Sequence, residues 1–203
     1  LDDILVGAKL NDEGSSDAGK VYLVLGSSLS STATLQLSEA DVMMWGELGE
    51  SVGHSISGAG DVDGDGLADL WIGAYGTSPG GSAYLVLGAS VDAGVNLQLN
   101  DDAIRFTGEN TSDIAGYSVS AAGDIDGDGL SDLLVGAYGN DDGGSAAGKT
   151  YLVVTPSACN TPPRGTAISI DPVLPKEVID DLVCEIETEA YDAEGDVISY
   201  TIE

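Results

Sequence analysis

One long motif occurs twice in this chain and sets its period. GDVDGDGLADLWIGAYG occupies residues 60–76, and GDIDGDGLSDLLVGAYG occupies residues 123–139, so the second copy starts 63 positions after the first. The preceding segments keep the same register, because GHSISGAGD at 53–61 aligns with GYSVSAAGD at 116–124. A period of this length indicates repeated supersecondary units that bury their faces against one another. We therefore expect a repeat protein.

Short strand patterns fill each repeat. Apolar runs of four to eight residues, rich in Val, Leu, Ile and Tyr, lie between clusters of Gly, Asp, Asn and Ser, which is typical of strands joined by turns. In the complete repeat we expect four strands, near 53–59, 67–74, 82–88 and 95–106. Runs such as LADLWIGA are apolar on both faces, as expected of strands packed between other sheets. Four-stranded units in series favour an all-β fold made of β-propeller blades.

The first residues of the chain fall inside a repeat. LDDILVGA at the start matches LADLWIGA and LSDLLVGA further on, so Asp3 is the counterpart of Asp69 and Asp132. About two and a half repeats then lie within residues 1–155, which predicts a partial β-propeller whose remaining blades lie outside this chain. Asp3 is the predicted remnant of a truncated aspartate loop.

The aspartates of the motif are spaced like the ligands of a hard cation. Carboxylates fall at positions 1, 3, 5 and 9 of each loop, and the backbone carbonyl of position 7 can turn inward. Anionic oxygen ligands on a flexible loop suit Ca²⁺ better than Mg²⁺, which requires stricter octahedral geometry. The sequence thus predicts two structural Ca²⁺ sites with these ligands: Asp61, Asp63, Asp65, the Leu67 carbonyl and Asp69 in the first loop, and Asp124, Asp126, Asp128, the Leu130 carbonyl and Asp132 in the second.

Two related calcium-binding loops do not fit this pattern. An EF-hand needs a bidentate Glu at position 12 and flanking helices, whereas Ile72 or Val135 stands at that position and the flanks have strand patterns. A dockerin or thrombospondin-type repeat lacks the intervening strands. Extracellular Ca²⁺ modules bind with a Kd of roughly 10⁻⁴–10⁻³ M. Millimolar Ca²⁺ would therefore add about 1.4 kcal/mol per site, which is enough to fasten a loop but too little for a switch.

The combined pattern resembles a known repeat. G-[HY]-S-[IV]-S-x-A-G-D, followed by D-x-D-G-D-G-L-x-D-L and G-A-Y-G, is similar to the FG-GAP repeat of integrin α-subunit β-propellers and their bacterial relatives. The chain departs from that repeat in two places, since the aromatic–glycine pair is Val52-Gly53 and Ala115-Gly116, and the GAP element is Gly-Ala-Tyr. The resemblance implies aspartate loops at the blade edges and a ring of about seven blades.

The resemblance also implies a function. It suggests a calcium-stabilised segment of a secreted or cell-surface protein that acts as a binding or adhesion scaffold, with an unidentified protein or glycan ligand. Two other functions stay open: a non-catalytic accessory propeller on a larger secreted hydrolase or lyase, and a spacer in a surface array. Glycan or protein binding by the complete propeller would favour adhesion.

No catalytic residue is predicted, so we expect a protein that is not an enzyme. His54 is the only histidine, and the repeat places Tyr117 at its position, which argues against a position-specific proton relay. Trp45 and Trp71 could stack on a glycan, but their repeat counterparts are Phe106 or Thr107 and Leu134. Core packing is therefore the favoured role for both tryptophans.

Composition excludes several partners. Six Lys+Arg against 35 Asp+Glu give a formal net charge of −29, so nucleic acid and anionic membrane surfaces would be repelled. Hydrophobic residues make up 42% of the chain, too many for a disordered acidic tail. No apolar run reaches the roughly 18–20 residues of a membrane-spanning helix, and we expect no membrane insertion.

The C-terminal quarter has a different pattern. PSACNTPPRG, within 156–165, is a Pro-rich linker, and 166–203 resembles the start of an immunoglobulin-like or cadherin-like β-sandwich. Cys159 and Cys184 are the only cysteines. They form either one disulfide, which suits an oxidising compartment, or two free thiols, and the calcium-type loops favour the disulfide. The acidic residues Asp192, Glu194 and Asp196 form either a ligand set or, as the favoured reading, a hairpin turn.

Overall fold

A computed structural model describes residues 2–13, 15–29, 34–155, 190–191 and 197–198. The chain divides into two compact units, Leu1–Ser157 and Ala158–Glu203. In the second unit the described residues form one antiparallel pair, β12 (Ala190–Tyr191) and β13 (Val197–Ile198). The predicted linker over 156–165, the Cys159–Cys184 pair and most of the expected sandwich over 166–203 lie outside the described residues.

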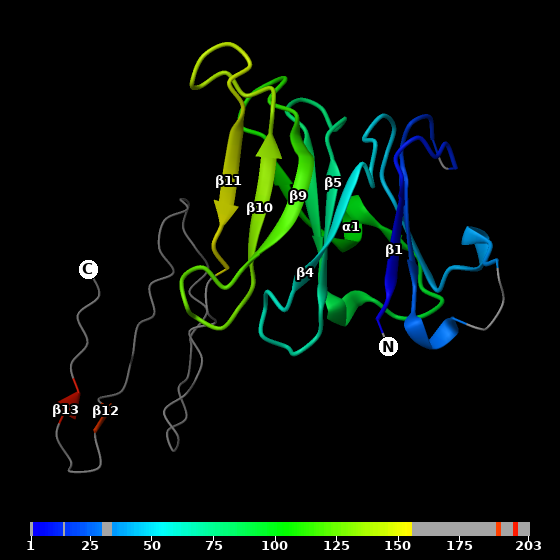
Figure 1. Cartoon of the computed structure of the whole chain (residues 1–203), viewed down its shortest axis with the longest axis horizontal. Helices are drawn as coiled ribbons and strands as arrows, with labels where there is room; N and C mark the ends of the chain where they lie inside the picture. Colours follow the sequence, from blue (N-terminus) through cyan, green and yellow to red (C-terminus); the bar gives the residue numbers. More distant parts are fainter. Residues whose placement is uncertain (1, 14, 30–33, 156–189, 192–196, 199–203) are drawn as a thin grey trace. The chain divides into compact units, whose positions relative to one another are not determined.

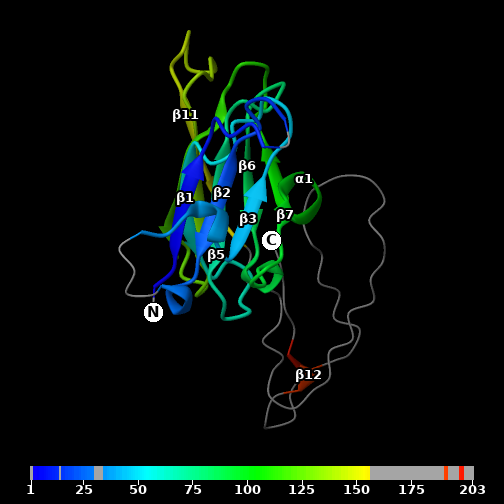
Figure 2. The ribbon, with the colours of Figure 1, turned by 90° about the vertical axis from the view of Figure 1, so that its right-hand side faces the viewer.

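The first unit is built of three sheets (Figure 1). The first has the strand order β1 (Ile4–Ala8), β2 (Lys20–Val24), β3 (Val42–Trp45) and β7 (Leu97–Gln98), and Figure 2 shows these four strands side by side. The second has the order β4 (Ser55–Gly60), β5 (Asp69–Ala74), β6 (Ser82–Val86) and β8 (Ile104–Thr107). The third has the order β11 (Lys149–Val153), β10 (Asp132–Ala137) and β9 (Ala115–Gly123).

Four short helices complete the described part of this unit. Three are 3-10 turns, η1 (Gly26–Ser28), η2 (Leu37–Glu39) and η3 (Gly88–Ser90), and the fourth is a single α-helical turn, α1 (Leu99–Asp102). Across the described residues, no helix has the length and apolar character needed to cross a membrane.

The register of the strands follows the sequence repeat. Ala8 pairs with Lys20, Ala74 with Ser82, and Ala137 with Lys149, so β1, β5 and β10 are equivalent strands, as are β2, β6 and β11. The second sheet holds all four strands of one repeat. The first sheet holds the last three strands of the preceding repeat, β1, β2 and β3, together with β7. The third sheet holds the first three strands of the following repeat. The mostly β architecture with sheets of four, four and three strands is consistent with partial propeller blades.

The fourth predicted strand is wrong in its extent. Residues 95–106 do not form one strand; they contain β7, α1 and β8 in succession. Leu97 and Leu99 are buried in the hydrophobic layer between the first and second sheets, and β7 pairs in parallel with β3 of the first sheet. The chain must then cross to the second sheet, and α1 makes that crossing, closed by a hydrogen bond from the Gln98 N–H to the Asp102 carboxylate at 2.8 Å.

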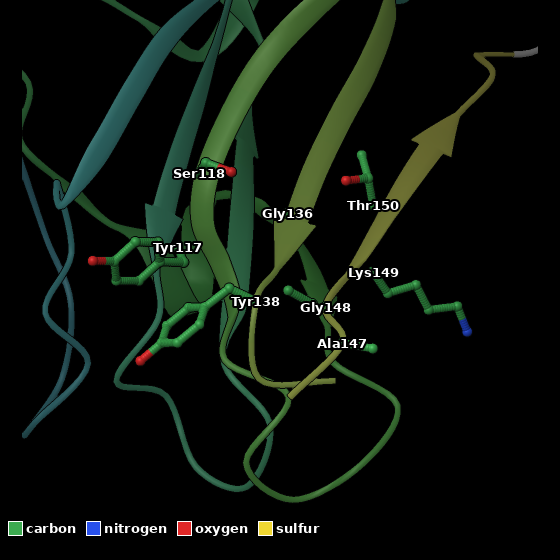
Figure 3. A pocket seen from close by; sticks show the side chains of 9 residues that line it. Tyr117, Ser118, Gly136, Tyr138, Ala147, Gly148, Lys149 and Thr150 are labelled. Atoms are coloured by element: carbon green, nitrogen blue, oxygen red, sulfur yellow. The ribbon is translucent and has the colours of Figure 1, made fainter. Parts of the chain in front are cut away.

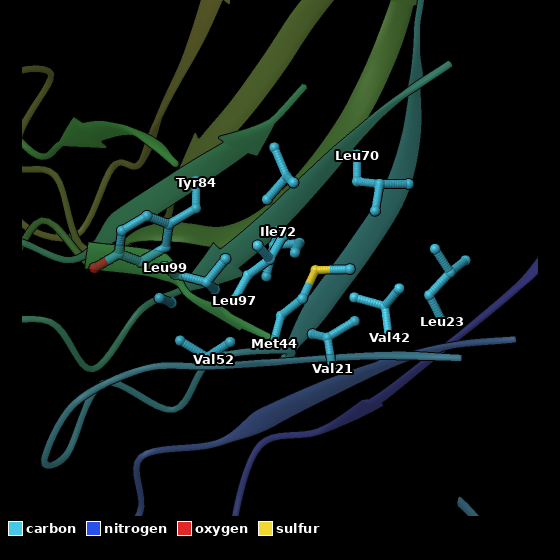
Figure 4. Close-up of a cluster of buried hydrophobic side chains, with 12 residues drawn as sticks. Val21, Leu23, Val42, Met44, Val52, Leu70, Ile72, Tyr84, Leu97 and Leu99 are labelled. Carbon is cyan, nitrogen blue, oxygen red and sulfur yellow. The ribbon is translucent and has the colours of Figure 1, made fainter. Parts of the chain in front are cut away.

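Two hydrophobic layers hold the three sheets together. The layer between the first and second sheets (Figure 4) contains Val21, Met44, Ile72 and Tyr84 among other buried side chains. The layer between the second and third sheets contains Trp71, Leu85, Val119, Leu133 and Val135. All six residues of β5 are buried, because its side chains alternate between the two layers. The expectation of strands that are apolar on both faces is confirmed at this strand.

The two tryptophans differ in their surroundings. Trp71 is fully buried and donates its indole N–H to the Leu134 carbonyl of the third sheet at 3.0 Å, so its predicted core role is confirmed. Trp45 is half-buried, and the Lys20 Nζ lies 5.7 Å from its ring centroid. The predicted core role of Trp45 is therefore met only in part, because its side chain is half-buried.

Candidate metal centre

Each aspartate loop coils tightly between two strands. The first loop joins β4 to β5, and Gly64 and Gly66 take φ values of 79° and 86°, which residues with a Cβ adopt rarely. The Asp61 carboxylate accepts hydrogen bonds from the N–H groups of Gly64 at 2.7 Å and Gly66 at 2.9 Å. The second loop, between β9 and β10, repeats this arrangement with Asp124 and its following glycines.

Three carboxylates converge in each loop. Asp61, Asp63 and Asp65 each offer an oxygen within 4.8 Å of the other two, and Asp124, Asp126 and Asp128 do the same. Two unit charges about 4 Å apart repel by about 1 kcal/mol in water and more near a protein surface. Each cluster is therefore a place where a cation would relieve repulsion. The predicted grouping of positions 1, 3 and 5 is present in both loops.

The second cluster contains an unsatisfied buried oxygen. The Asp128 Oδ1 accepts the Leu130 N–H at 2.8 Å, while its Oδ2 is buried and has no hydrogen-bond partner among the described residues. A buried carboxylate oxygen without a partner is destabilising. A hard cation in this cluster would satisfy it, which fits the carboxylate donor set.

The aspartate at position 9 lies outside both clusters. Asp69 is fully buried, and its two oxygens accept the N–H groups of Val62 at 2.8 Å and Gly88 at 2.7 Å. Asp132 likewise accepts the N–H groups of Ile125 at 2.8 Å and Thr155 at 2.9 Å. Both side chains therefore anchor the start of their loop to the segment after the third strand of the repeat.

Asp3 forms one of the two backbone hydrogen bonds that Asp69 and Asp132 form. Its carboxylate accepts the Gly26 N–H at 2.8 Å, which is the repeat counterpart of the bond between Asp69 and Gly88. Asp3 was expected as the remnant of a metal loop, and the structure shows it in this backbone hydrogen bond. The sequence reasoning missed the anchoring role, although the position of the aspartate at the start of a fully apolar strand was a signal for it. The assignment of Asp69 and Asp132 as ligands stays a prediction.

The two anchors have opposite pKa shifts. Burial raises the pKa of Asp69, against the opposing effect of the Gly88 and Val62 N–H groups, and the charges of Asp63 and Asp65 add to the rise. The N–H groups of Ile125 and Thr155 lower the pKa of Asp132. The Thr155 hydroxyl, 3.4 Å from the Asp132 Oδ1, is a further donor that favours the ionised form.

The predicted carbonyl ligands, Leu67 and Leu130, lie in the loops as expected. The N–H of each bonds the aspartate at position 5, Asp65 at 2.7 Å and Asp128 at 2.8 Å. The two loops also touch, because the Ser131 N–H donates to the Asp61 carbonyl at 2.9 Å. Figure 1 shows both loops at the same end of the sheets. A cation in one loop would thus lie next to the backbone of the other.

An aromatic row lies elsewhere on the same unit. The His54 ring is 4.6 Å from the rings of both Tyr75 and Tyr117, and Tyr117 is 4.6 Å from Tyr138. Figure 3 shows Tyr117 and Tyr138 beside a pocket of about 330 Å³. Burial, followed by the charge of Lys9, lowers the pKa of His54. His54 packs among tyrosines, and the repeated tyrosine of GAYG was the sequence signal for this row.

Comparison with known proteins agrees with the repeat. Residues 115–153 match the family model described as FG-GAP repeat. The chain is 33% identical to Integrin alpha-5 of Xenopus laevis over 151 residues, which is 70% of this chain and 14% of that protein. It is 33% identical to Integrin alpha-IIb of Homo sapiens over 145 residues, 68% of this chain and 13% of that protein.

A third relative is also an integrin alpha chain, and the match again covers a small share of its length. Integrin alpha pat-2 of Caenorhabditis briggsae is 29% identical over 157 residues, 76% of this chain and 12% of that protein. The chain thus spans about one seventh of the length of these relatives or less. Residues 115–153 therefore match an FG-GAP repeat, and the chain is similar to a segment of integrin alpha chains.

Proposed function

We propose that this chain is a calcium-stabilised propeller segment of a secreted or cell-surface protein, and that it serves as a binding and adhesion scaffold. The observation that carries the proposal is the pair of equivalent three-carboxylate clusters, one of them with a buried, unpartnered Asp128 oxygen. The names of the integrin relatives support the adhesion role. We propose no catalytic role.

Calcium would act by closing each loop. The carboxylates at positions 1, 3 and 5 would hold the ion, with the carbonyl of position 7 and the aspartate of position 9 as further ligands. A bound ion supplies positive charge that offsets the mutual repulsion of the carboxylates. The loop between β4 and β5 would then be fixed next to the loop between β9 and β10, and the interface between two sheets would be fastened at that end.

The proposal also covers the parts that lie outside the described residues. We propose the division into blades at 1–155, a linker at 156–165 and the start of an immunoglobulin-like module at 166–203. The compactness of Leu1–Ser157 as a unit supports the first boundary. A disulfide between Cys159 and Cys184 would fit a secreted protein, and alkylation of the native protein followed by mass spectrometry tests it.

Thermal unfolding with and without Ca²⁺ tests the calcium role. Two sites that each add about 1.4 kcal/mol would raise the Tm of a chain of this size by about 5–10 °C. The Tm of the full chain is measured in EGTA, in millimolar Ca²⁺ and in millimolar Mg²⁺, and Mg²⁺ is expected to give the smaller rise.

A double variant supplies the control. Asp63→Asn with Asp126→Asn removes one exposed cluster carboxylate from each loop and leaves the buried anchors intact. This variant should lose most of the rise in Tm with Ca²⁺. A wild-type Tm that is the same in EGTA and in Ca²⁺ would contradict the proposed calcium role.

A further inference from the structure

A pocket of about 670 Å³ lies where the first sheet meets the second. Trp45, Glu47 and Glu50 line it from the end of β3 and the following loop, and Gln98 lines it from β7 of the same sheet. Thr77, after β5, and Arg105, in β8, line it from the second sheet. This volume lies within the usual range for small-ligand sites, about 300–1,000 Å³. The pocket is separate from the aspartate loops and from the aromatic row.

The base of this pocket is held by a polar network. Glu50 is only 5% exposed, and its carboxylate accepts the Glu47 N–H at 2.8 Å, the Asn100 side-chain amide at 3.2 Å and the Tyr84 hydroxyl at 3.0 Å. The Arg105 Nε donates to the Ser82 hydroxyl at 3.1 Å. Glu50 and Arg105 are therefore held in place before any ligand arrives, which lowers the entropy lost on binding.

Comparison between repeats shows that the residues around this pocket differ from those at the equivalent place of the next interface. Lys20 and Lys149 occupy the repeat position that is Ser82 in the second sheet. At the next interface Lys149 forms ion pairs with Glu109 at 2.9 Å and with Asp142 at 2.8 Å. Glu109 is the repeat counterpart of Glu47.

Serine in place of lysine leaves Glu47 without the ion pair of its counterpart. In the part of the chain that the structure describes, neither Glu47 nor Arg105 forms an ion pair, and both side chains are exposed. Trp45, which lines the same pocket, is replaced by Thr107 in the following repeat. A serine in place of lysine, a glutamate without an ion pair and a tryptophan therefore occur together at the interface of the first and second sheets, and not at that of the second and third.

The chemistry of a ligand follows from three side chains that line the pocket, Glu47, Arg105 and Trp45. Glu47 only accepts hydrogen bonds, Arg105 only donates them, and Trp45 offers apolar aromatic surface. A sugar hydroxyl both donates and accepts, so neighbouring hydroxyls can bind the carboxylate and the guanidinium together. The net charge of −29 disfavours an anionic ligand, and Arg105 disfavours a cationic one.

We propose that this pocket binds one neutral pyranose unit of a glycan, with its C–H face on Trp45 and its hydroxyls on Glu47 and Arg105. The proposal rests on the binding role proposed above and supplies its ligand class. It does not depend on calcium, because the pocket shares no residue with the aspartate clusters.

Protein NMR on the full chain tests the pocket. Four probes are titrated to about 100 mM, so that a site with a Kd of about 1 mM is saturated: the methyl glycosides of glucose, galactose, mannose and N-acetylglucosamine. At least one should shift the indole N–H signal of Trp45 along a saturable curve, while the signal of the buried Trp71 stays unchanged. Trp45→Phe assigns the signal.

Two variants and a matched control decide the outcome. Glu47→Gln and Arg105→Ala should each weaken binding about tenfold or more, because each removes a charged hydrogen-bond partner. Glu109→Gln, the same change at the next interface, should leave binding unchanged. Absence of a saturable shift with all four sugars, or equal affinity in Glu47→Gln, overturns the proposal.

Measuring the Tm in Ca²⁺ and EGTA on the same samples keeps the two proposals distinguishable. A normal Ca²⁺ response without sugar binding overturns the sugar pocket and leaves the calcium scaffold standing. Sugar binding without a Ca²⁺ response supports the pocket and overturns the calcium role. A saturable shift of the Trp45 indole signal with a lysine-rich peptide, lost in Glu47→Gln, together with no shift from any sugar, would show that the pocket takes protein and would overturn the glycan assignment.

Discussion

Asp63 and Asp69 lie in the same loop but have opposite surroundings. Asp63 is exposed and faces two other carboxylates, whereas Asp69 is fully buried and accepts two backbone N–H groups. The first arrangement is unfavourable without a cation, because like charges repel. The second is favourable without one, because both oxygens have donors.

This contrast gives a prediction at the residue scale. Asp69→Asn should lower the free energy of unfolding by about 1–3 kcal/mol even in EGTA, because an amide nitrogen cannot accept a backbone N–H and one buried donor loses its partner. Asp63→Asn should raise stability in EGTA slightly, because it removes one of three mutually repelling charges, and it should reduce the gain from Ca²⁺. Urea unfolding followed by tryptophan fluorescence, with and without Ca²⁺, measures both.

Equal stability of Asp69→Asn and wild type in EGTA would show that the two backbone bonds contribute nothing. Asp132→Asn is the matched variant in the second loop, where Ile125 and Thr155 are the donors. It should behave as Asp69→Asn does.

At the scale of single elements, β5 explains why neighbouring sheets come so close. Gly73 lies in this strand, and a Cβ added there would overlap the Gly116 carbonyl of the third sheet. Gly7, its counterpart in β1, meets in the same way the carbonyl of Gly53, which lies just before β4 of the second sheet. The strand repeat thus uses a glycine for backbone-to-backbone contact between sheets.

Gly73→Ala should therefore destabilise the first unit. Backbone, unlike a flexible side chain, cannot move aside locally, so we expect a loss of about 1–3 kcal/mol, seen as a lower Tm by circular dichroism. Gly58→Ala is the control, because the site in β4 has nothing within 4 Å of an added Cβ and no positive φ. A loss as large for Gly58→Ala as for Gly73→Ala would contradict the close-approach argument.

Charge acts at the scale of the whole molecule. The formal net charge is −29, and two Ca²⁺ ions would offset only four of these charges. Self-repulsion at such a charge destabilises the folded chain, and salt screens it, since the Debye length falls from about 30 Å at 0.01 M to about 3 Å at 1 M.

The Tm in EGTA should therefore rise with NaCl concentration, and it should rise less when Ca²⁺ is present. Differential scanning fluorimetry over a series of salt concentrations measures this. Choline chloride is the control, because screening depends on ionic strength and not on binding of Na⁺ to the loops. A Tm in EGTA that does not respond to either salt would show that self-repulsion contributes little.

The repeat, the strand pairing and the loops could be predicted from the sequence because they are local and periodic. The alignment of LDDILVGA with LADLWIGA and LSDLLVGA predicted three equivalent strands, and β1, β5 and β10 pair with their neighbours in one common register. Glycine and aspartate spacing likewise predicted the convergence of positions 1, 3 and 5, since the residues of a tight loop are close in space by necessity.

The features that could not be predicted from the sequence depend on contacts between sheets. The stretch 95–106 has one apolar pattern, but β7 pairs with β3 of the first sheet and β8 pairs with β6 of the second, so the segment divides. Asp69 shares the aspartate spacing, yet its burial against Val62 and Gly88 gives it a different role from Asp63. The pocket at Trp45 combines residues that lie far apart in the sequence, such as Trp45 and Arg105.

The sequence by itself therefore determined the period, the strand type and the loop chemistry of this chain. Tertiary structure decided which aspartates face one another and which accept backbone N–H groups, and which residues line the pocket between the first two sheets. The physical reason is range: turn geometry and alternation act over a few residues, whereas burial, desolvation and ion pairing depend on residues brought together from different repeats.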